Sequence, residues 1–83
     1  MITVRLPGTL RVGDSDTLTF AEPLADLAAL IEALDRRIPG LREQLDDSVF
    51  SFAVNDELLL QHARQRRLVD GDSVEIIPTI SGG

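Results

Sequence analysis

The sequence predicts a single α+β domain in which a mixed sheet of four to five strands packs against one main helix on one of its faces. Three observations favour this class. Short segments at both ends of the chain alternate apolar and polar residues, a longer segment repeats apolar residues every three or four positions, and turn-forming residues mark the boundaries. A chain of 83 residues suits one such domain and is too short for a large enclosed active site.

Strand segments are expected before the helix. In Ile2–Leu6, apolar residues alternate with Thr and Arg at the two-residue period of a half-buried strand, and Pro7-Gly8 then turns the chain. A similar alternation runs through Thr9–Val12, and the turn-forming residues after it lead into Thr17–Phe20. We expect these segments to form a hairpin with an irregular or bulged connection.

One main helix is predicted from about Pro23 to Ile38. Its apolar residues fall on one stripe at three- and four-residue spacings: Leu24, Leu27, Leu30, Ile31, Leu34 and Ile38. Pro23 suits the first helical position, and Pro39-Gly40 stops the helix. Leu41–Leu45 is expected to add a short helical turn.

The second half of the chain returns to strand signals. Val49–Val54 is rich in β-branched and aromatic residues, and Asn55-Asp56 supplies a turn into a short return strand, Glu57–Leu60. Gln61–Arg67 is polar and aperiodic and is expected to be the longest loop. Ser73–Ile77 is the last predicted strand, with positions 74 and 76 on one face and positions 75 and 77 on the other.

The predicted element order is β-β-α-β-β-β, and the first and last strands carry the longest apolar patterns. We expect these two strands to pair as parallel neighbours in the centre of the sheet. This arrangement is the β-grasp, or ubiquitin-like, fold. It divides the chain into a β-grasp domain, residues 1–77, and a flexible C-terminal tail, residues 78–83, that ends in Gly-Gly.

Composition excludes several functions. The net charge of −6 argues against a nucleic-acid partner, because binding to a phosphate backbone requires dense positive charge. The sequence contains no cysteine, which excludes disulfides, thiolate metal sites and a cysteine nucleophile. No stretch is apolar for long enough to span a membrane, so we expect a soluble, cytoplasmic protein. We also expect it to be a monomer when free.

The polar segment after the fourth strand carries the one histidine and a basic cluster. His62 has no second histidine or cysteine to complete a metal site, so no metal is expected. Arg64, Arg66 and Arg67 form either a solvated loop or a contact for an acidic patch on a partner.

The C-terminal tail offers the group with the clearest chemical use. Gly82 and Gly83 have no Cβ, so the backbone there can enter a narrow cleft and adopt conformations closed to other residues. Such an end can present its α-carboxylate to the active site of another protein. Taken alone, the two glycines are explained more simply by a frayed terminus or a remnant of cloning.

Three motifs in the second half point to one family. They are Val54-Asn55 opening a hairpin, Leu68 before Asp70-Gly71-Asp72-Ser73-Val74, and a terminal Pro78-x-x-x-Gly82-Gly83. In their order and spacing these motifs resemble those of the MoaD/ThiS-like sulfur carriers. The resemblance covers the whole chain in length and element order, and it is sharpest from Phe52 to Gly83.

The resemblance implies a carrier that is not itself an enzyme. An ATP-using enzyme similar to ubiquitin-activating enzymes adenylates the carboxylate of Gly83, which is then converted to a thiocarboxylate, and Gly82 belongs to the same site. ATP and magnesium belong to the activating enzyme, so no cofactor is expected on this chain. A sulfur-accepting synthase is the second implied partner.

Three biosynthetic pathways stay open for this carrier. Small subunits of molybdopterin synthase often have a more aromatic first strand and a second proline where Thr79 follows Pro78 here. The segments Leu6–Arg11, Val54–Glu57 and Asp70–Val74 look at least as similar to the carriers that supply sulfur for cysteine synthesis. Thiamin-thiazole carriers rank third.

Two other function classes are compatible with a chain that ends in two glycines. A protein modifier would be joined through Gly83 to lysines of other proteins. A plain β-grasp interaction module would bind partners through its surface, and its terminal glycines would be incidental.

Partner contacts are expected from the tail and from the neighbouring sheet surface. The expected partner-binding residues are Pro78, Thr79, Ile80, Ser81, Ile77 and Leu59. Ile80 has no core to join, so it can anchor in a partner groove. Pro78 is expected to end the last strand because it cannot donate to the ladder. Ile77 and Leu59 either belong to an exposed apolar patch on the outer sheet face or fill a gap in the core.

Overall fold

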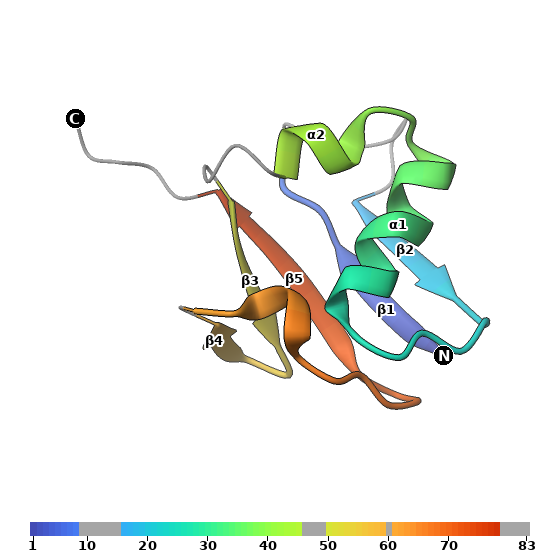
Figure 1. Cartoon of the computed structure of the whole chain (residues 1–83), viewed down its shortest axis with the longest axis vertical. Helices are drawn as coiled ribbons and strands as arrows, with labels where there is room; N and C mark the ends of the chain where they lie inside the picture. The colour runs from blue at the N-terminus through green and yellow to red at the C-terminus, as the bar shows by residue number, and fades with distance from the viewer. Residues whose placement is uncertain (9–15, 46–49, 60, 79–83) are drawn as a thin grey trace.

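The fold is a five-stranded sheet with its helices on one side (Figure 1). A computed structural model describes residues 1–8, 16–45, 50–59 and 61–78 of the chain. The strands are β1 (Ile2–Arg5), β2 (Thr17–Phe20), β3 (Phe50–Val54), β4 (Glu57–Leu59) and β5 (Ser73–Pro78). The helices are α1 (Leu27–Arg37), α2 (Leu41–Leu45) and the 3₁₀ helix η2 (Ala63–Gln65).

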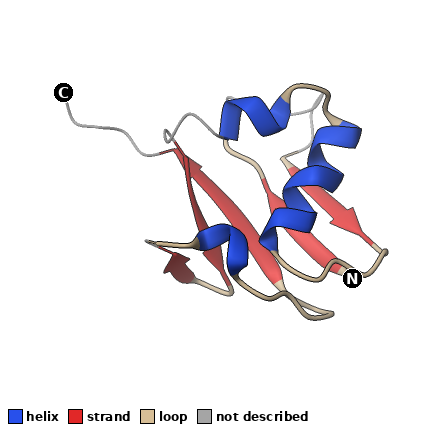
Figure 2. Cartoon of the chain, in the orientation of Figure 1, coloured by secondary structure: helices blue, strands red, loops and turns tan. Residues whose placement is uncertain are grey.

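The strand order in the sheet is β2-β1-β5-β3-β4. The first and last strands, β1 and β5, pair in parallel at the centre, and every other neighbouring pair is antiparallel. Figure 2 shows the sheet beside the helical layer. The predicted α+β class and β-grasp arrangement are therefore confirmed.

The main helix begins four residues later than the sequence predicts. Asp26 is the N-cap, and its carboxylate accepts a hydrogen bond from Ala29 N at 2.9 Å. The preceding residues instead dock on the segment after η2, where Leu68 N donates to Ala25 O at 3.0 Å. Pro23 therefore lies before the helix and not at its first position, which corrects the expectation. The helix ends at Arg37, before Pro39.

The core lies between the inner face of the sheet and the apolar stripe of α1. The stripe buries Leu27, Leu30, Ile31, Ala33 and Leu34. The sheet contributes Ile2, Val4, Phe20, Phe52, Val54, Val74 and Ile76, all at most 5% exposed. Arg37 covers the ring of Phe20, with its guanidinium 4.0 Å from the ring centroid.

The second half differs from expectation at two places. The segment predicted as the longest loop, Gln61–Arg67, contains the 3₁₀ helix η2. The last strand runs one residue further than expected, through Pro78. The turn at Asn55-Asp56 is confirmed, because both residues have positive φ (51° and 69°), as the two-residue turn of a tight hairpin requires.

Some predictions fall outside the described residues. These are the strand Thr9–Val12, the strand residues Val49 and Leu60, and the tail after Pro78. They stay predictions.

Candidate functional site

β5 is the strand that leads to the C-terminal tail. It lies between β1 and β3, and its last residue, Pro78, stands opposite Phe50 of β3. Pro78 is exposed and has no N–H to donate to the ladder. In Figure 1 this end of β5 lies far from the N-terminus of the chain. The central strand of the fold therefore delivers the chain to one edge of the domain.

The tail itself lies beyond the described residues. The residues concerned are Thr79, Ile80, Ser81, Gly82 and Gly83. Their expected roles in chemistry and in partner binding therefore stay predictions. The structure describes the strand from which they emerge and the surface beside it.

The strand register separates Ile77 from Leu59. Leu59 stands opposite Phe52, which stands opposite Ile76, so all three lie on the inner face. Leu59 is half-buried and packs against the core. Ile77 stands opposite Ser51 on the outer face. The structure therefore favours the core-gap alternative for Leu59 and the outer-face alternative for Ile77, and the two do not share one patch.

Sequence reasoning missed a second apolar residue on the outer face. Leu58 of β4 stands opposite Ala53, which stands opposite Glu75. The side chain of Leu58 is 51% exposed, which is high for a large apolar residue. The strand β4 alternates, so the exposed member of the Leu58–Leu59 pair could have been found only with the register in hand.

Charged residues flank this apolar surface. On the outer face, Arg5 of β1 stands beside Glu75 of β5, and both are exposed. The outer face thus combines the apolar groups of Ile77 and Leu58 with one charge of each sign. A surface of this composition can contact a protein, with the apolar groups supplying area and the charges fixing orientation.

The start of β5 is fixed by a side-chain network around Asp72. The carboxylate of Asp72 accepts hydrogen bonds from Asn55 Nδ2 at 2.8 Å and from Val69 N at 2.9 Å. Asn55 Oδ1 in turn accepts from Ser73 N at 3.0 Å. Together these bonds tie the β3–β4 turn to the turn that precedes β5.

The same network explains the acidity of Asp72. The hydrogen bond from the Val69 backbone and then that from the Asn55 side chain lower the pKa of Asp72 below 3.8. Burial opposes them, and the charge of Arg66 adds to them. Within the described ranges, Asp72 is the one buried polar residue, at 9% exposure. Sequence reasoning treated the Asp-Gly-Asp motif as a turn and missed this role.

The basic cluster is partly used inside the domain. Arg66 forms an ion pair with Glu57 at 2.9 Å, and the backbone at Arg67 bridges to Asp26. His62 is exposed, with φ of 54°. Among the described residues, no three His, Cys, Asp or Glu side chains gather into a metal-binding group, and none of the described helices is both long and apolar enough to cross a bilayer.

Comparison with known proteins gives matches of two kinds. The profile of the ThiS family matches residues 4–83. Among solved structures, the chain is similar to CysO of Mycobacterium tuberculosis, an antigen, with a TM-score of 0.84 and 27% identity over 96% of this chain and 100% of that one. No curated protein matches the sequence.

Two further similar structures are protein complexes. A chain of the BexX/CysO complex of Amycolatopsis orientalis aligns with a TM-score of 0.83 and 25% identity over 100% of both chains. A chain of the complex of subunits 1 and 2 of the molybdopterin-converting factor of Helicobacter pylori 26695 aligns with a TM-score of 0.63 and 29% identity, over 99% of this chain and 97% of that one. With the profile match over nearly its whole length, the chain belongs to the ThiS family, which confirms the resemblance to the MoaD/ThiS-like sulfur carriers.

Proposed function

We propose that this protein is a sulfur carrier whose terminal residue, Gly83, is adenylated and converted to a thiocarboxylate. The observation that carries the proposal is the match to the ThiS family, which extends from the first strand through Gly83. The fold supports it, because β5 crosses the centre of the sheet and brings the chain to one edge at Pro78.

The chemistry needs an activated carboxyl group. The Gly83 carboxylate attacks the α-phosphorus of ATP, which releases pyrophosphate and leaves an acyl adenylate. A reduced sulfur donor then attacks the acyl carbon, AMP departs, and a C–S bond replaces a C–O bond. The thiocarboxylate stores that sulfur as a nucleophile for a second enzyme. ATP and Mg²⁺ belong to the activating enzyme in this scheme.

The role of this chain is to present its terminal carboxylate and to be recognised by the enzyme partners. Gly82 and Gly83 have no side chains to block a narrow catalytic cleft. Pro78 is the last described residue of β5 and has no N–H to donate to a sheet ladder. Pro78 to Ser81 and the outer-face residue Ile77 are the proposed contacts for the enzyme partners. In this role the protein is a substrate and carrier and not a catalyst.

Two partners follow from the scheme, an adenylating enzyme and a sulfur-accepting synthase. Two of the similar structures are complexes of small chains with partner proteins, which supports protein partners in general. The CysO structures have higher TM-scores than the molybdopterin-converting factor. The pathway stays open between cysteine and molybdopterin synthesis, with thiamin third. We place the site of action in the cytoplasm.

The decisive experiment removes the last residue. A chain without Gly83, or with one residue added after it, is expected to lose ATP–pyrophosphate exchange with its activating enzyme. Gly8→Ala is the matched control, because Gly8 is exposed and a Cβ there meets nothing within 4 Å. Undiminished exchange by the shortened chain would contradict the proposal.

Intact mass spectrometry identifies the product. The carrier is expected to gain the mass difference between sulfur and oxygen after incubation with the activating enzyme and a sulfur donor. Isopeptide-linked adducts on lysines of other proteins, without that gain, would instead identify a protein modifier.

A further inference from the structure

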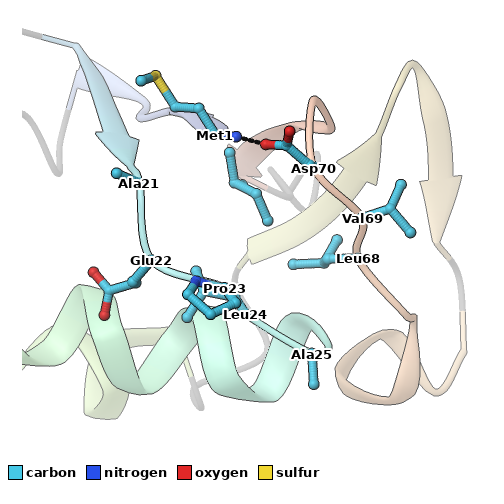
Figure 3. A pocket seen from close by; sticks show the side chains of 10 residues that line it. Met1, Ala21, Glu22, Pro23, Leu24, Ala25, Leu68, Val69 and Asp70 are labelled. Atoms are coloured by element: carbon cyan, nitrogen blue, oxygen red, sulfur yellow. Dashed lines mark ion pairs between the residues drawn. The ribbon is translucent and has the colours of Figure 1, made fainter.

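A pocket lies at the end of the sheet opposite Pro78. It has a volume of about 560 Å³ and is lined by three segments, residues 1–2, 21–25 and 68–70 (Figure 3). These segments are the start of β1, the connection from β2 to α1, and the connection from η2 to β5. None of the residues expected to bind the sulfur-transfer partners lines it.

Backbone hydrogen bonds join the three walls. Leu68 N donates to Ala25 O at 3.0 Å, and Gly71 N donates to Met1 O at 2.9 Å. Gly71 has φ of +93°, a conformation that favours glycine and that turns the chain back toward Met1. Because each wall is bonded to the next through its backbone, the pocket is formed before any partner arrives.

The pocket has an apolar floor and an apolar rim. Ile2, Leu24 and Leu68 are at most 8% exposed and form the floor. Met1 and Val69, 59% and 65% exposed, stand at the rim. In the part of the chain that the structure describes, three large apolar side chains are exposed, and these are two of them. Apolar surface gathered at one hollow in this way marks a contact site.

The charged groups at the rim select the partner. Asp70 and Glu22 both line the pocket, and the chain as a whole carries a net charge of −6. Asp70 pairs with the N-terminal ammonium group, and Glu22 pairs with Arg36 at 3.5 Å. Both pairs are exposed, so they contribute little and an incoming cation can replace either one. Each carboxylate at the rim already has a cation beside it, so the net charge of −6 decides the preference, and it favours a basic partner over an acidic one.

The pocket and the tail can be used at the same time. The pocket lies beside the start of β5, whereas the tail leaves from its end at Pro78. A six-residue strand separates those points by about 17 Å. A partner in the pocket thus leaves Pro78 accessible.

We propose that this pocket binds a segment of a partner protein that presents one aliphatic side chain between basic residues. The aliphatic group enters between Leu24, Leu68 and Val69, and the basic groups pair with Glu22 and Asp70. The contact is separate from the chemistry at Gly83, so its test leaves the proposed function untouched.

The test is an NMR titration of the ¹⁵N-labelled full chain with three blocked peptides. Acetyl-Arg-Leu-Arg-amide is expected to shift the amide signals of Ile2, Ala25 and Val69, with a dissociation constant on the order of 1 mM for so small a ligand. Acetyl-Glu-Leu-Glu-amide and acetyl-Leu-amide are expected to bind at least about threefold more weakly.

Two matched variants locate the binding. Val69→Ser is expected to raise the dissociation constant of the basic peptide about fivefold by removing apolar contact. Leu58→Ser removes a similarly exposed apolar side chain from the outer sheet face and is expected to leave it unchanged. Spectra of the free variants show that each is folded. Equal binding of all three peptides, or binding by Val69→Ser as tight as that of the unsubstituted chain, would overturn the proposal.

Discussion

The two faces of β5 serve different purposes. On the inner face, Val74 and Ile76 are at most 2% exposed and pack in the single core of the domain. On the outer face, Glu75 is exposed and Ile77 only half-buried. Ile76 and Ile77 are neighbours of identical composition, yet one is part of the core and the other faces away from it.

The two ends of the same strand differ in a similar way. The start is held by the hydrogen bonds of Asp72 and Asn55, which tie the β3–β4 turn to the turn that precedes β5. The end pairs with Phe50 through a proline that cannot donate a hydrogen bond. The contacts that stabilise the domain are therefore concentrated on the inner face and at the start of β5, and the outer face and the Pro78 end contribute fewer of them.

The largest expected effect comes from substituting the two isoleucines. Ile76→Ala is expected to lower the free energy of unfolding by about 2–5 kcal/mol, because it removes buried methylene groups and leaves a cavity. Ile77→Ala is expected to cost less than about 1 kcal/mol, since the outer face is partly hydrated already. Urea denaturation followed by circular dichroism measures both.

The same two variants should rank in the reverse order when their effect on KM with the adenylating enzyme is measured. Ile77→Ala is expected to raise KM for the carrier with little change in kcat, because it removes a proposed partner contact and leaves the reacting carboxylate in place. Ile76→Ala, measured where it is still folded, is expected to keep KM. Equal stability losses for the two variants would show that the faces do not differ as the burial indicates.

The start of β5 is tested by Asp72→Asn. An amide has one acceptor oxygen where the carboxylate has two, so its NH₂ group would face either Val69 N or the Asn55 amide donor. Rotating the Asn55 amide does not repair this, because its oxygen already accepts from Ser73 N. We expect a loss of about 1–3 kcal/mol in the free energy of unfolding at neutral pH.

The pH dependence of stability tests the role of Asp72 independently. Because the pKa of Asp72 is lowered in the folded state, its contribution to stability is present above the pKa of the unfolded chain. That contribution disappears as pH falls through the lowered pKa, below 3.8. Asp72→Asn should therefore lose less stability than the unsubstituted protein on acidification. Asp70→Asn, two residues away and 87% exposed, is the control, because it removes a nearby carboxylate that makes none of the hydrogen bonds of Asp72.

Periodicity predicted the parts of the fold that burial alone determines. The alternation in Ile2–Leu6 and Ser73–Ile77 predicted strands whose inner residues are buried, and the apolar stripe predicted α1. The predicted start of that helix was wrong, because Pro23 is a favourable residue at a first helical position when only its sequence neighbours are considered. The start of the helix is instead set by Asp26, whose side chain caps it, and by the hydrogen bond between Ala25 and Leu68, a contact between distant segments.

For the candidate site, the chemistry of the Gly-Gly end stays a prediction, and the surface beside it could not be predicted. Family motifs pointed to the Gly-Gly end, but they carry no information on strand register, and register decides that Leu59 faces the core and Leu58 faces out. The Asp72 network was missed for the same reason. Asn55 and Asp72 are 17 positions apart, so nothing local in the sequence pairs them.

The smallest expected effect concerns the ion pair between Glu57 and Arg66, which joins β4 to the segment after η2. The Glu57 side chain is 66% exposed and that of Arg66 is 32% exposed, so water and salt screen the pair. Arg66→Gln is expected to cost about 0.2–1 kcal/mol at low salt and less at high salt. The backbone bond from Leu27 N to Arg66 O is kept in this variant, which isolates the side chain. Urea denaturation at two salt concentrations measures the effect. A loss of unfolding free energy as large as that of Asp72→Asn would show that this edge of the sheet contributes as much to stability as the start of β5.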